Sequence, residues 1–197
     1  MTWQSMNWHV APPHASVGAD GVLTVETAKG SDYWRETQYG FVRDHGHALL
    51  RPAPREFTVT VTVQGQYEHL YDQAGLMVRS SETHWLKQGV EFVGRQQWSA
   101  VVTRQKSDWS VLPAGNHEVT QFRCIRRGDA LILHARPGTT GNWTLMRVAD
   151  YPPELDAQVG VFACSPERAG FQVKFLDFQL SPPDWRSLHE LTQDTSP

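Results

Sequence analysis

Charged side chains in two consecutive alternating segments could bind or transform a polar ligand. Arg79 ends the segment 72–79, in which apolar and polar residues alternate. Lys87 and Glu91 lie in the next such segment, 85–92. Successive side chains of a strand point to opposite faces, so the polar residues of each segment share one face. If the two strands pair, Arg79, Lys87 and Glu91 come close enough to contact one ligand.

Aromatic and amide side chains could complete a ligand site around these charges. A sugar presents flat apolar C–H faces that stack on indole rings, and its hydroxyl groups take charge-assisted hydrogen bonds. An anionic sugar could also bind Arg79 and Lys87 directly. We therefore interpret eight residues as candidate ligand-binding residues: Gln73, Arg79, Trp85, Lys87, Glu91, Trp109, Trp34 and His134.

The same cluster also has a structural interpretation, in which Arg79 or Lys87 forms a cross-strand ion pair with Glu91 among packed aromatic rings. Exposed ion pairs contribute only about 0.2–1 kcal/mol to stability. A ligand site on an exposed polar face predicts that Arg79→Ala barely changes the melting temperature. Unfolding caused by Arg79→Ala and by Glu91→Ala would instead favour the structural interpretation.

Two kinds of enzyme remain as alternatives. A glycosidase needs two carboxyl groups about 5–10 Å apart, whereas Glu91 is the only acid on its strand. Asp72 or Asp108 would have to supply the second carboxyl group. A lyase or epimerase could instead use His134 or Tyr33 as a base, with Arg79 and Lys87 neutralising a uronate.

We expect no metal and no cofactor. His45 and His47 have the spacing of two imidazoles on one side of a strand, but the sequence offers them no third ligand. Nucleotide-binding and nucleophile-elbow motifs are absent. Cys124 and Cys164 lie in apolar segments, so we interpret them as buried, unpaired thiols.

Short strands must position these groups. Segments 22–26, 56–63, 72–79, 85–92 and 99–103 alternate, and about a dozen such strands at regular spacing are typical of an antiparallel sandwich. We expect the apolar faces to be buried between two sheets, and residues 29–39 to form a loop. These apolar faces include Ala74, Leu76, Val78, Val90 and Phe92.

Two further segments carry specific expectations. Arg127-Gly128-Asp129 lies between two strand-like runs and is typical of a hairpin turn rather than an adhesive motif. In the tail, Asp184 could cap a short helix that places Trp185, Leu188 and Leu191 on one side.

Composition limits the class of protein. The chain has 197 residues, which suits one domain, and a net charge of -3 without blocks of like charge. We therefore expect neither a nucleic-acid partner nor a membrane partner. The first ten residues lack the basic and apolar regions of a signal peptide, so we expect a cytoplasmic protein.

Several segments together resemble domain-of-unknown-function family 1349. This YesU-like family includes the fungal regulation-of-enolase protein. The resemblance covers roughly residues 3–180, and it implies a concanavalin A-like lectin/glucanase jelly roll of two antiparallel sheets, one of them concave. It therefore implies a single domain over 1–197, with a core at about 3–180 and a tail at 181–197. The segments that carry it are 72–79, 85–91, 101–103 with 107–110, 127–129 and 170–177.

These observations predict a protein that binds a carbohydrate or a similar polar metabolite on the concave sheet, without chemistry. An enzyme acting on sugars through Glu91, with Arg79 or His134, is the first alternative. The second is a regulatory protein that binds a protein partner, as the name of the fungal relatives suggests. The sequence leaves the ligand and the oligomeric state open.

Overall fold

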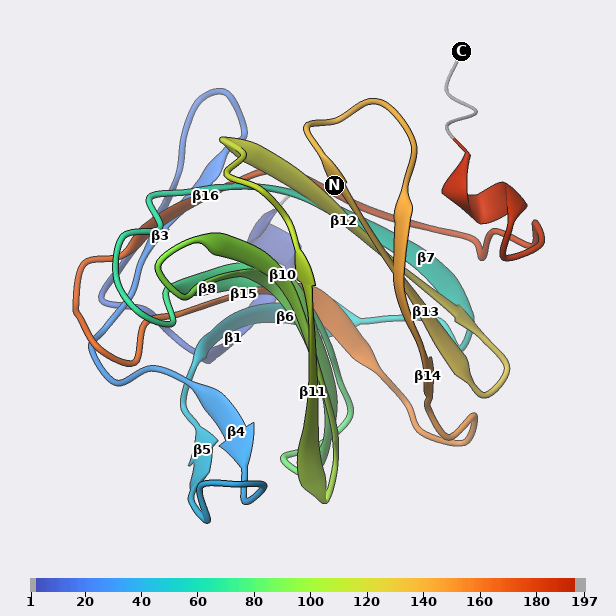
Figure 1. Cartoon of the computed structure of the whole chain (residues 1–197), viewed down its shortest axis with the longest axis horizontal. Coiled ribbons are helices and arrows are strands. Elements are labelled where there is room, and N and C mark those ends of the chain that lie inside the picture. The colour runs from blue at the N-terminus through green and yellow to red at the C-terminus, as the bar shows by residue number, and fades with distance from the viewer. Residues whose placement is uncertain (1–2, 194–197) are drawn as a thin grey trace.

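The computed structural model describes residues 3–193 as two antiparallel sheets packed face to face (Figure 1). Within that range the chain is almost entirely β-structure, with 3-10 turns at Trp3–Ser5 and Glu190–Thr192. This arrangement confirms the prediction of an all-β sandwich. In the described part of the chain no helix is long and apolar enough to cross a membrane.

The first sheet carries the segments that contain Arg79, Lys87 and Glu91. Its strands follow the order β1-β6-β15-β8-β9-β10-β11. Their bounds are β1 Asn7–Val10, β6 His47–Pro52, β8 Gln73–Arg79, β9 His84–Phe92, β10 Gln96–Arg104, β11 Lys106–Pro113 and β15 Gln158–Cys164.

The second sheet follows the order β14-β13-β12-β7-β16-β3-β2. Its turn between β12 and β13 contains Gly128 and Asp129, as the sequence predicts, and Gly128 has a φ of 55°, which favours glycine. The strands are β2 His14–Val17, β3 Leu23–Glu26, β7 Phe57–Gly65, β12 Val119–Arg127, β13 Ala130–Pro137, β14 Thr144–Asp150 and β16 Gln172–Ser181.

The main core lies between the two sheets. Alternation along β8 and β9 buries Ala74, Leu76, Val78 and Val90 there, as predicted. Phe92 differs from the prediction, because it ends β9 and is only half-buried. The opposite side chains of β8 and β9 point away from the core, onto what we call the outer face of the first sheet.

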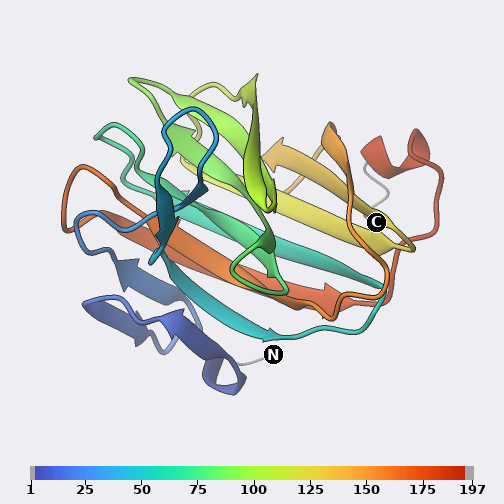
Figure 2. The same ribbon diagram turned by 90° about the horizontal axis from the view of Figure 1, so that it is seen from below.

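A small separate hairpin covers part of this outer face. It consists of β4 (Tyr33–Arg35) and β5 (Val42–Asp44), which pair only with each other among the described strands. In Figure 2 the hairpin crosses in front of the strands of the first sheet. The prediction of a loop over 29–39 is therefore wrong at β4, whose three residues are too few to show alternation.

The tail differs from the predicted helix. Up to residue 193, where the described part of the chain ends, the tail forms one 3-10 turn, Glu190–Thr192, and no longer helix. Asp184 binds the Arg186 side chain through its carboxylate, at 2.6 Å, instead of capping a helix. Leu191 packs against the second sheet, whereas Trp185 and Leu188 are exposed. The three apolar residues therefore do not share one docked side.

The two cysteines lie in different sheets. Cys124 is in β12 within the main core, and Cys164 is in β15 on the outer face beneath the hairpin. Both thiols are free and buried, and burial raises the pKa of each. A high pKa keeps a thiol protonated and poorly nucleophilic, so these side chains act as packing groups.

Candidate ligand site on the outer face

Strand register gathers polar side chains at one place on the outer face. Gln73 on β8 lies opposite Glu91 on β9, and Lys87 lies opposite Val101 on β10. Val101 in turn lies opposite Trp109 on β11. These residues come from four consecutive strands of a single sheet, and adjacent strands bring their side chains within contact distance.

Two glycines keep the space between Lys87 and Glu91 free of side chains. Gly75 and Gly89 lie opposite each other on β8 and β9. A Cβ atom at Gly89 would come within 2.2 Å of the Ala74 carbonyl oxygen, so the strands could not keep this spacing around a larger residue. Gly89 therefore lines a small hollow that Lys87 and Glu91 also line.

The hairpin is held over the sheet by Tyr33. This side chain is fully buried, donates a hydrogen bond to the Gly46 carbonyl oxygen at 2.5 Å, and packs on Trp85 with ring centroids 5.8 Å apart. Arg35 adds a hydrogen bond from its Nε to the Gln105 carbonyl oxygen, at 3.0 Å. These contacts fix the aromatic residues of the hairpin beside the polar residues of the sheet.

Sheet and hairpin together enclose a pocket of about 180 Å³. Drug-sized ligands occupy pockets of about 300–1,000 Å³, so this one suits a smaller molecule such as a single sugar ring. Its lining residues are Asp32, Trp34, Tyr39, Phe41, Arg43, Tyr71, Gln73, Lys87, Glu91, Val101, Trp109, Pro166 and Glu167.

The two cations of the pocket are already paired within the protein. The Lys87 ammonium group donates to the Gln73 amide oxygen at 2.6 Å and lies 3.4 Å from an Asp32 carboxylate oxygen. Arg43 approaches the other Asp32 oxygen at 3.4 Å, and its guanidinium lies 4.2 Å from the centre of the Phe41 ring. The Asp32 carboxylate therefore partly neutralises both Lys87 and Arg43.

Glu91 is a buried carboxyl group of the pocket. Its side chain is only 8% exposed, and its Oε2 atom has no hydrogen-bond partner among residues 3–193. Burial raises the pKa of Glu91, and nearby Asp32 raises it further. Lys87 and hydrogen bonds from Ser99 and Gln97 oppose that rise. A buried, unpartnered oxygen can accept a hydrogen bond from a ligand.

Aromatic rings form the walls. Trp34 and Trp109 meet edge to face with centroids 6.5 Å apart, and Trp34 contacts Tyr39 at 5.6 Å. The Trp109 indole donates to the Ser99 hydroxyl at 2.9 Å, which fixes the ring above the floor. Trp109 is 40% exposed and Tyr39 is 52% exposed, so both offer apolar surface to a ligand.

The structure brings together five of the eight residues that the sequence analysis selected, and separates three. Gln73, Lys87, Glu91, Trp34 and Trp109 line the pocket. Arg79 lies on the same outer face but does not line the pocket. Its guanidinium group donates two hydrogen bonds to the Asp44 carboxylate, at 2.8 and 2.7 Å. Its exposure is only 7%, which corrects the expectation of an exposed arginine.

Trp85 and His134 also lie away from the pocket. Trp85 is 1% exposed and packs under Tyr33, so its ring cannot serve as a platform for a sugar. His134 is on β13 of the second sheet, fully buried near Trp143. Burial and neighbouring arginines lower the pKa of His134 to about 3.

Several lining residues were not expected from the sequence. Asp32, Tyr39, Phe41 and Arg43 come from the hairpin or its ends, and Tyr71 precedes β8. The only available signal was the density of aromatic residues between 33 and 41. Neither acid suggested as a partner for Glu91 lines this pocket: Asp72 binds Arg168 at 2.7 Å, and Asp108 binds Arg147 at 2.9 Å.

His47, one of the two histidines considered as metal ligands, contacts the backbone instead. The His47 ring accepts a hydrogen bond from the Ala28 backbone N–H at 3.0 Å, and its other nitrogen contacts the Val10 carbonyl oxygen at 3.3 Å. Both ring nitrogens are thus used by the backbone. Within residues 3–193 no group of three or more His, Cys, Asp or Glu side chains is placed to hold a metal ion.

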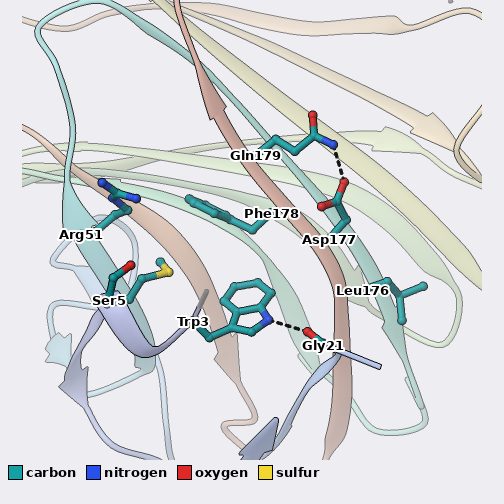
Figure 3. Close-up of a pocket in the computed structure, with 9 residues that line it drawn as sticks. Trp3, Ser5, Gly21, Arg51, Leu176, Asp177, Phe178 and Gln179 are labelled. Carbon is teal, nitrogen blue, oxygen red and sulfur yellow. Dashed lines mark hydrogen bonds between the residues drawn. The ribbon is translucent and has the colours of Figure 1, made fainter. Parts of the chain in front are cut away.

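A second hollow, of about 240 Å³, lies near the start of the chain (Figure 3). Two pairs of its polar groups hydrogen-bond to each other: Trp3 donates to the Gly21 carbonyl oxygen at 2.9 Å, and Gln179 donates to Asp177 at 2.8 Å. The Trp3 ring packs on Phe178 with centroids 5.8 Å apart. These contacts attach the N-terminal segment to β16, so we assign this hollow a structural role.

The raised pKa of Glu91 predicts a pH-dependent stability. A carboxyl group whose pKa is higher in the folded protein than in the unfolded chain stabilises the fold when the pH is below the unfolded-state pKa. This stabilisation is lost as the pH rises through the folded-state pKa. Glutamine cannot ionise and keeps the shape of the side chain. We therefore expect Glu91→Gln to stabilise the free protein at about pH 7, with the gain vanishing near pH 4, below the ordinary glutamate pKa of about 4.3.

Urea unfolding of both proteins at the two pH values measures this gain. A glutamine variant that is less stable than the wild type at neutral pH would show that Glu91 is a satisfied structural carboxylate.

Comparisons with known proteins identify relatives of the chain. A model of the family described as "Protein of unknown function (DUF1349)" matches residues 8–183. The Saccharomyces cerevisiae protein named "Regulation of enolase protein 1" is 40% identical over 173 residues, which is 87% of each chain. A crystal structure of a functionally unknown protein from S. cerevisiae is 39% identical, with a TM-score of 0.88 over 93% of this chain and 100% of that one.

More distant structures share the fold alone. The GH43 protein BlXynB from Bacillus licheniformis is 14% identical, with a TM-score of 0.67 over 87% of this chain and 35% of that one. An alginate lyase from Pseudomonas aeruginosa is 9% identical, with a TM-score of 0.56 over 86% of each chain. The chain therefore shares its two-sheet sandwich fold with parts of these proteins.

Proposed function

Because the chain belongs to the DUF1349 family of proteins of unknown function, we propose its function from the site itself: the outer-face pocket binds a small carbohydrate or a related polar metabolite. One observation carries this proposal. Buried polar groups, Gln73, Lys87 and Glu91, form the floor, and exposed rings of Trp109 and Tyr39 stand beside them. Pockets of this composition match the two kinds of surface that a sugar ring presents.

The names of the fold neighbours agree with this proposal. They include a xylan beta-1,4-xylosidase and an alginate lyase, whose names refer to polysaccharides. Their identities to this chain are 13% and 9%, so they support the fold, and the ligand class remains our proposal.

Replacement of Trp109 tests the proposal. Loss of an aromatic wall removes stacking area, and aromatic contacts contribute about 0.5–1.5 kcal/mol beyond their buried area. We expect Trp109→Ala to weaken binding of a recognised monosaccharide by about 10-fold or more, at about 1.4 kcal/mol per decade. Calorimetric titration of a monosaccharide panel measures the effect.

Trp185 provides the matched control, because it is 64% exposed and does not line the pocket. Trp185→Ala should bind the same sugar as the wild type does. If wild type, Trp109→Ala and Trp185→Ala bind the sugar with equal affinity, the pocket is not the sugar-binding site.

An enzyme acting on sugars is the alternative that a specific observation favours. A general acid needs a carboxyl group with a raised pKa, and the burial of Glu91 supplies one. Asp32 and Glu167, rather than Asp72 or Asp108, are the other carboxyl groups that line the pocket. Release of product from a bound glycoside, abolished by Glu91→Gln, would establish this alternative over simple binding.

A regulatory role through a protein partner is the third function. Its support is the name of the yeast relative, which refers to regulation of enolase. Around the pocket, Tyr39, Val42, Trp109 and Val111 are exposed, and a partner could cover these side chains. Sugar binding and partner binding through the same rim would compete, which a titration of both ligands would reveal.

A further inference from the structure

We propose that the pocket prefers a ligand with a protonated amine, such as an amino sugar, over the equivalent neutral or acidic sugar. This inference rests on the proposed function and names the class of ligand that the same site takes. It follows from the balance of charge in the pocket, from the free oxygen of Glu91 and from the aromatic walls.

The balance of charge is negative. Asp32, Glu91 and Glu167 supply three carboxyl groups to the lining, against the two cations Lys87 and Arg43. Asp32 lies 3.4 Å from each of these cations and compensates both in part. Glu91 and Glu167 therefore set the charge that an incoming ligand meets.

Glu91 supplies the specific contact. Its Oε2 atom is buried without a partner among the described residues, while Ser99 and Gln97 hydrogen-bond to the same carboxyl group. The charged and titratable groups that act on Glu91 or are acted on by it come from several elements: Lys87 from β9, Asp32 from the start of the hairpin and Tyr71 from the segment before β8. Glu167, from the loop after β15, lines the same pocket. An ammonium group at Oε2 would satisfy this oxygen and relieve the repulsion from Asp32.

The aromatic walls favour the same charge. Trp34, Tyr39, Phe41, Tyr71 and Trp109 all line the pocket. Ring faces carry negative electrostatic potential and attract cations within about 6 Å of the ring centre. Arg43 already uses the face of Phe41 in this way, at 4.2 Å. The remaining rings line the same pocket as Glu91.

An acidic ligand would meet two cations in the pocket, Lys87 and Arg43, and Asp32 already lies 3.4 Å from each of them. Arg79, which the sequence analysis assigned to anionic sugars, is bound by Asp44 through both of its terminal nitrogens, at 2.8 and 2.7 Å. Lys87 is bound by Gln73 at 2.6 Å and approached by Asp32. A carboxylate in the pocket would have to displace these contacts and would meet Glu91 and Glu167.

Calorimetric titration of the wild-type protein with D-glucosamine, D-glucose and D-glucuronate tests the preference. We expect D-glucosamine to bind about 10-fold to 100-fold more tightly than D-glucose, because hydrogen bonds to charged groups are the stronger ones. D-glucuronate should bind more weakly than either. Glu91→Gln should reduce the gap between the amino sugar and the neutral sugar to within about threefold.

Glu167→Gln is the matched control, since it removes one charge from the exposed rim and leaves the Glu91 contact intact. It should keep most of the preference. If D-glucose or D-glucuronate binds as tightly as D-glucosamine, the inferred preference is wrong and the proposed function stands. If the wild type binds none of the three sugars, both are contradicted.

Discussion

Trp85→Ala should lower the free energy of unfolding by about 3–5 kcal/mol, the usual cost of deleting a buried aromatic side chain. The indole is 1% exposed and packs on Tyr33, Met77 and Val101 beneath the hairpin. Alanine would leave a cavity under the hairpin, because the surrounding strands cannot collapse to fill it. Chemical denaturation of wild type and variant measures the loss.

Trp109→Ala is the informative comparison, because Trp109 is 40% exposed on the same face. That substitution should change stability by less than about 1 kcal/mol and should act on ligand binding instead. If Trp85→Ala were as stable as Trp109→Ala, the hairpin would not be packed on the sheet as the structure shows.

Arg79→Ala should destabilise the protein by about 3 kcal/mol, which differs from the small effect that an exposed arginine would have. Removing one partner of a buried ion pair costs about 3–5 kcal/mol, because the other charge is left uncompensated. We expect the lower end of that range, since the Asp44 side chain is 23% exposed and His9 lies 3.4 Å from it. Thermal and urea unfolding measure the change.

A double-mutant cycle with Asp44→Ala isolates the pair. The loss in the double variant should be well below the sum of the two single losses, because either substitution alone breaks the same contact. Arg79→Lys should recover only part of the stability, because an ammonium group cannot form both hydrogen bonds at once. Additive losses would show that Arg79 stabilises the fold through other contacts.

The sandwich could be predicted because alternation is a local property of the sequence. Residues 72–79 and 85–92 alternate between apolar and polar, and the structure buries Ala74, Leu76, Val78 and Val90 on the apolar side. The same alternation placed Gln73, Lys87 and Glu91 on one face of neighbouring strands. Strand pairing then brought them together, because β8 and β9 are consecutive in sequence.

The roles of Arg79, Trp85 and His134 depend on contacts that alternation does not encode. Asp44, the partner of Arg79, is 35 residues away in the sequence. Trp85 has the parity of the polar face, but a hairpin distant in sequence covers it. For His134, alternation cannot indicate which of the two sheets contains its strand, and the structure assigns that strand to the second sheet.

The hairpin itself could not be predicted, because its strands have only three residues each. Alternation needs several residues to become visible. As a result, the sequence-based site lacked four lining residues from the hairpin or its ends: Asp32, Tyr39, Phe41 and Arg43. Its position is set by long-range contacts of Tyr33 and Arg35 with Gly46 and Gln105.

Soaking crystals of the protein with a monosaccharide panel that includes D-glucosamine tests the central claim most directly. We expect a bound sugar between the hairpin and the first sheet, in contact with Trp109 and with Glu91 Oε2. Electron density for the sugar in the hollow beside Trp3, or on the second sheet near His134, would show that the outer-face pocket is not the ligand site.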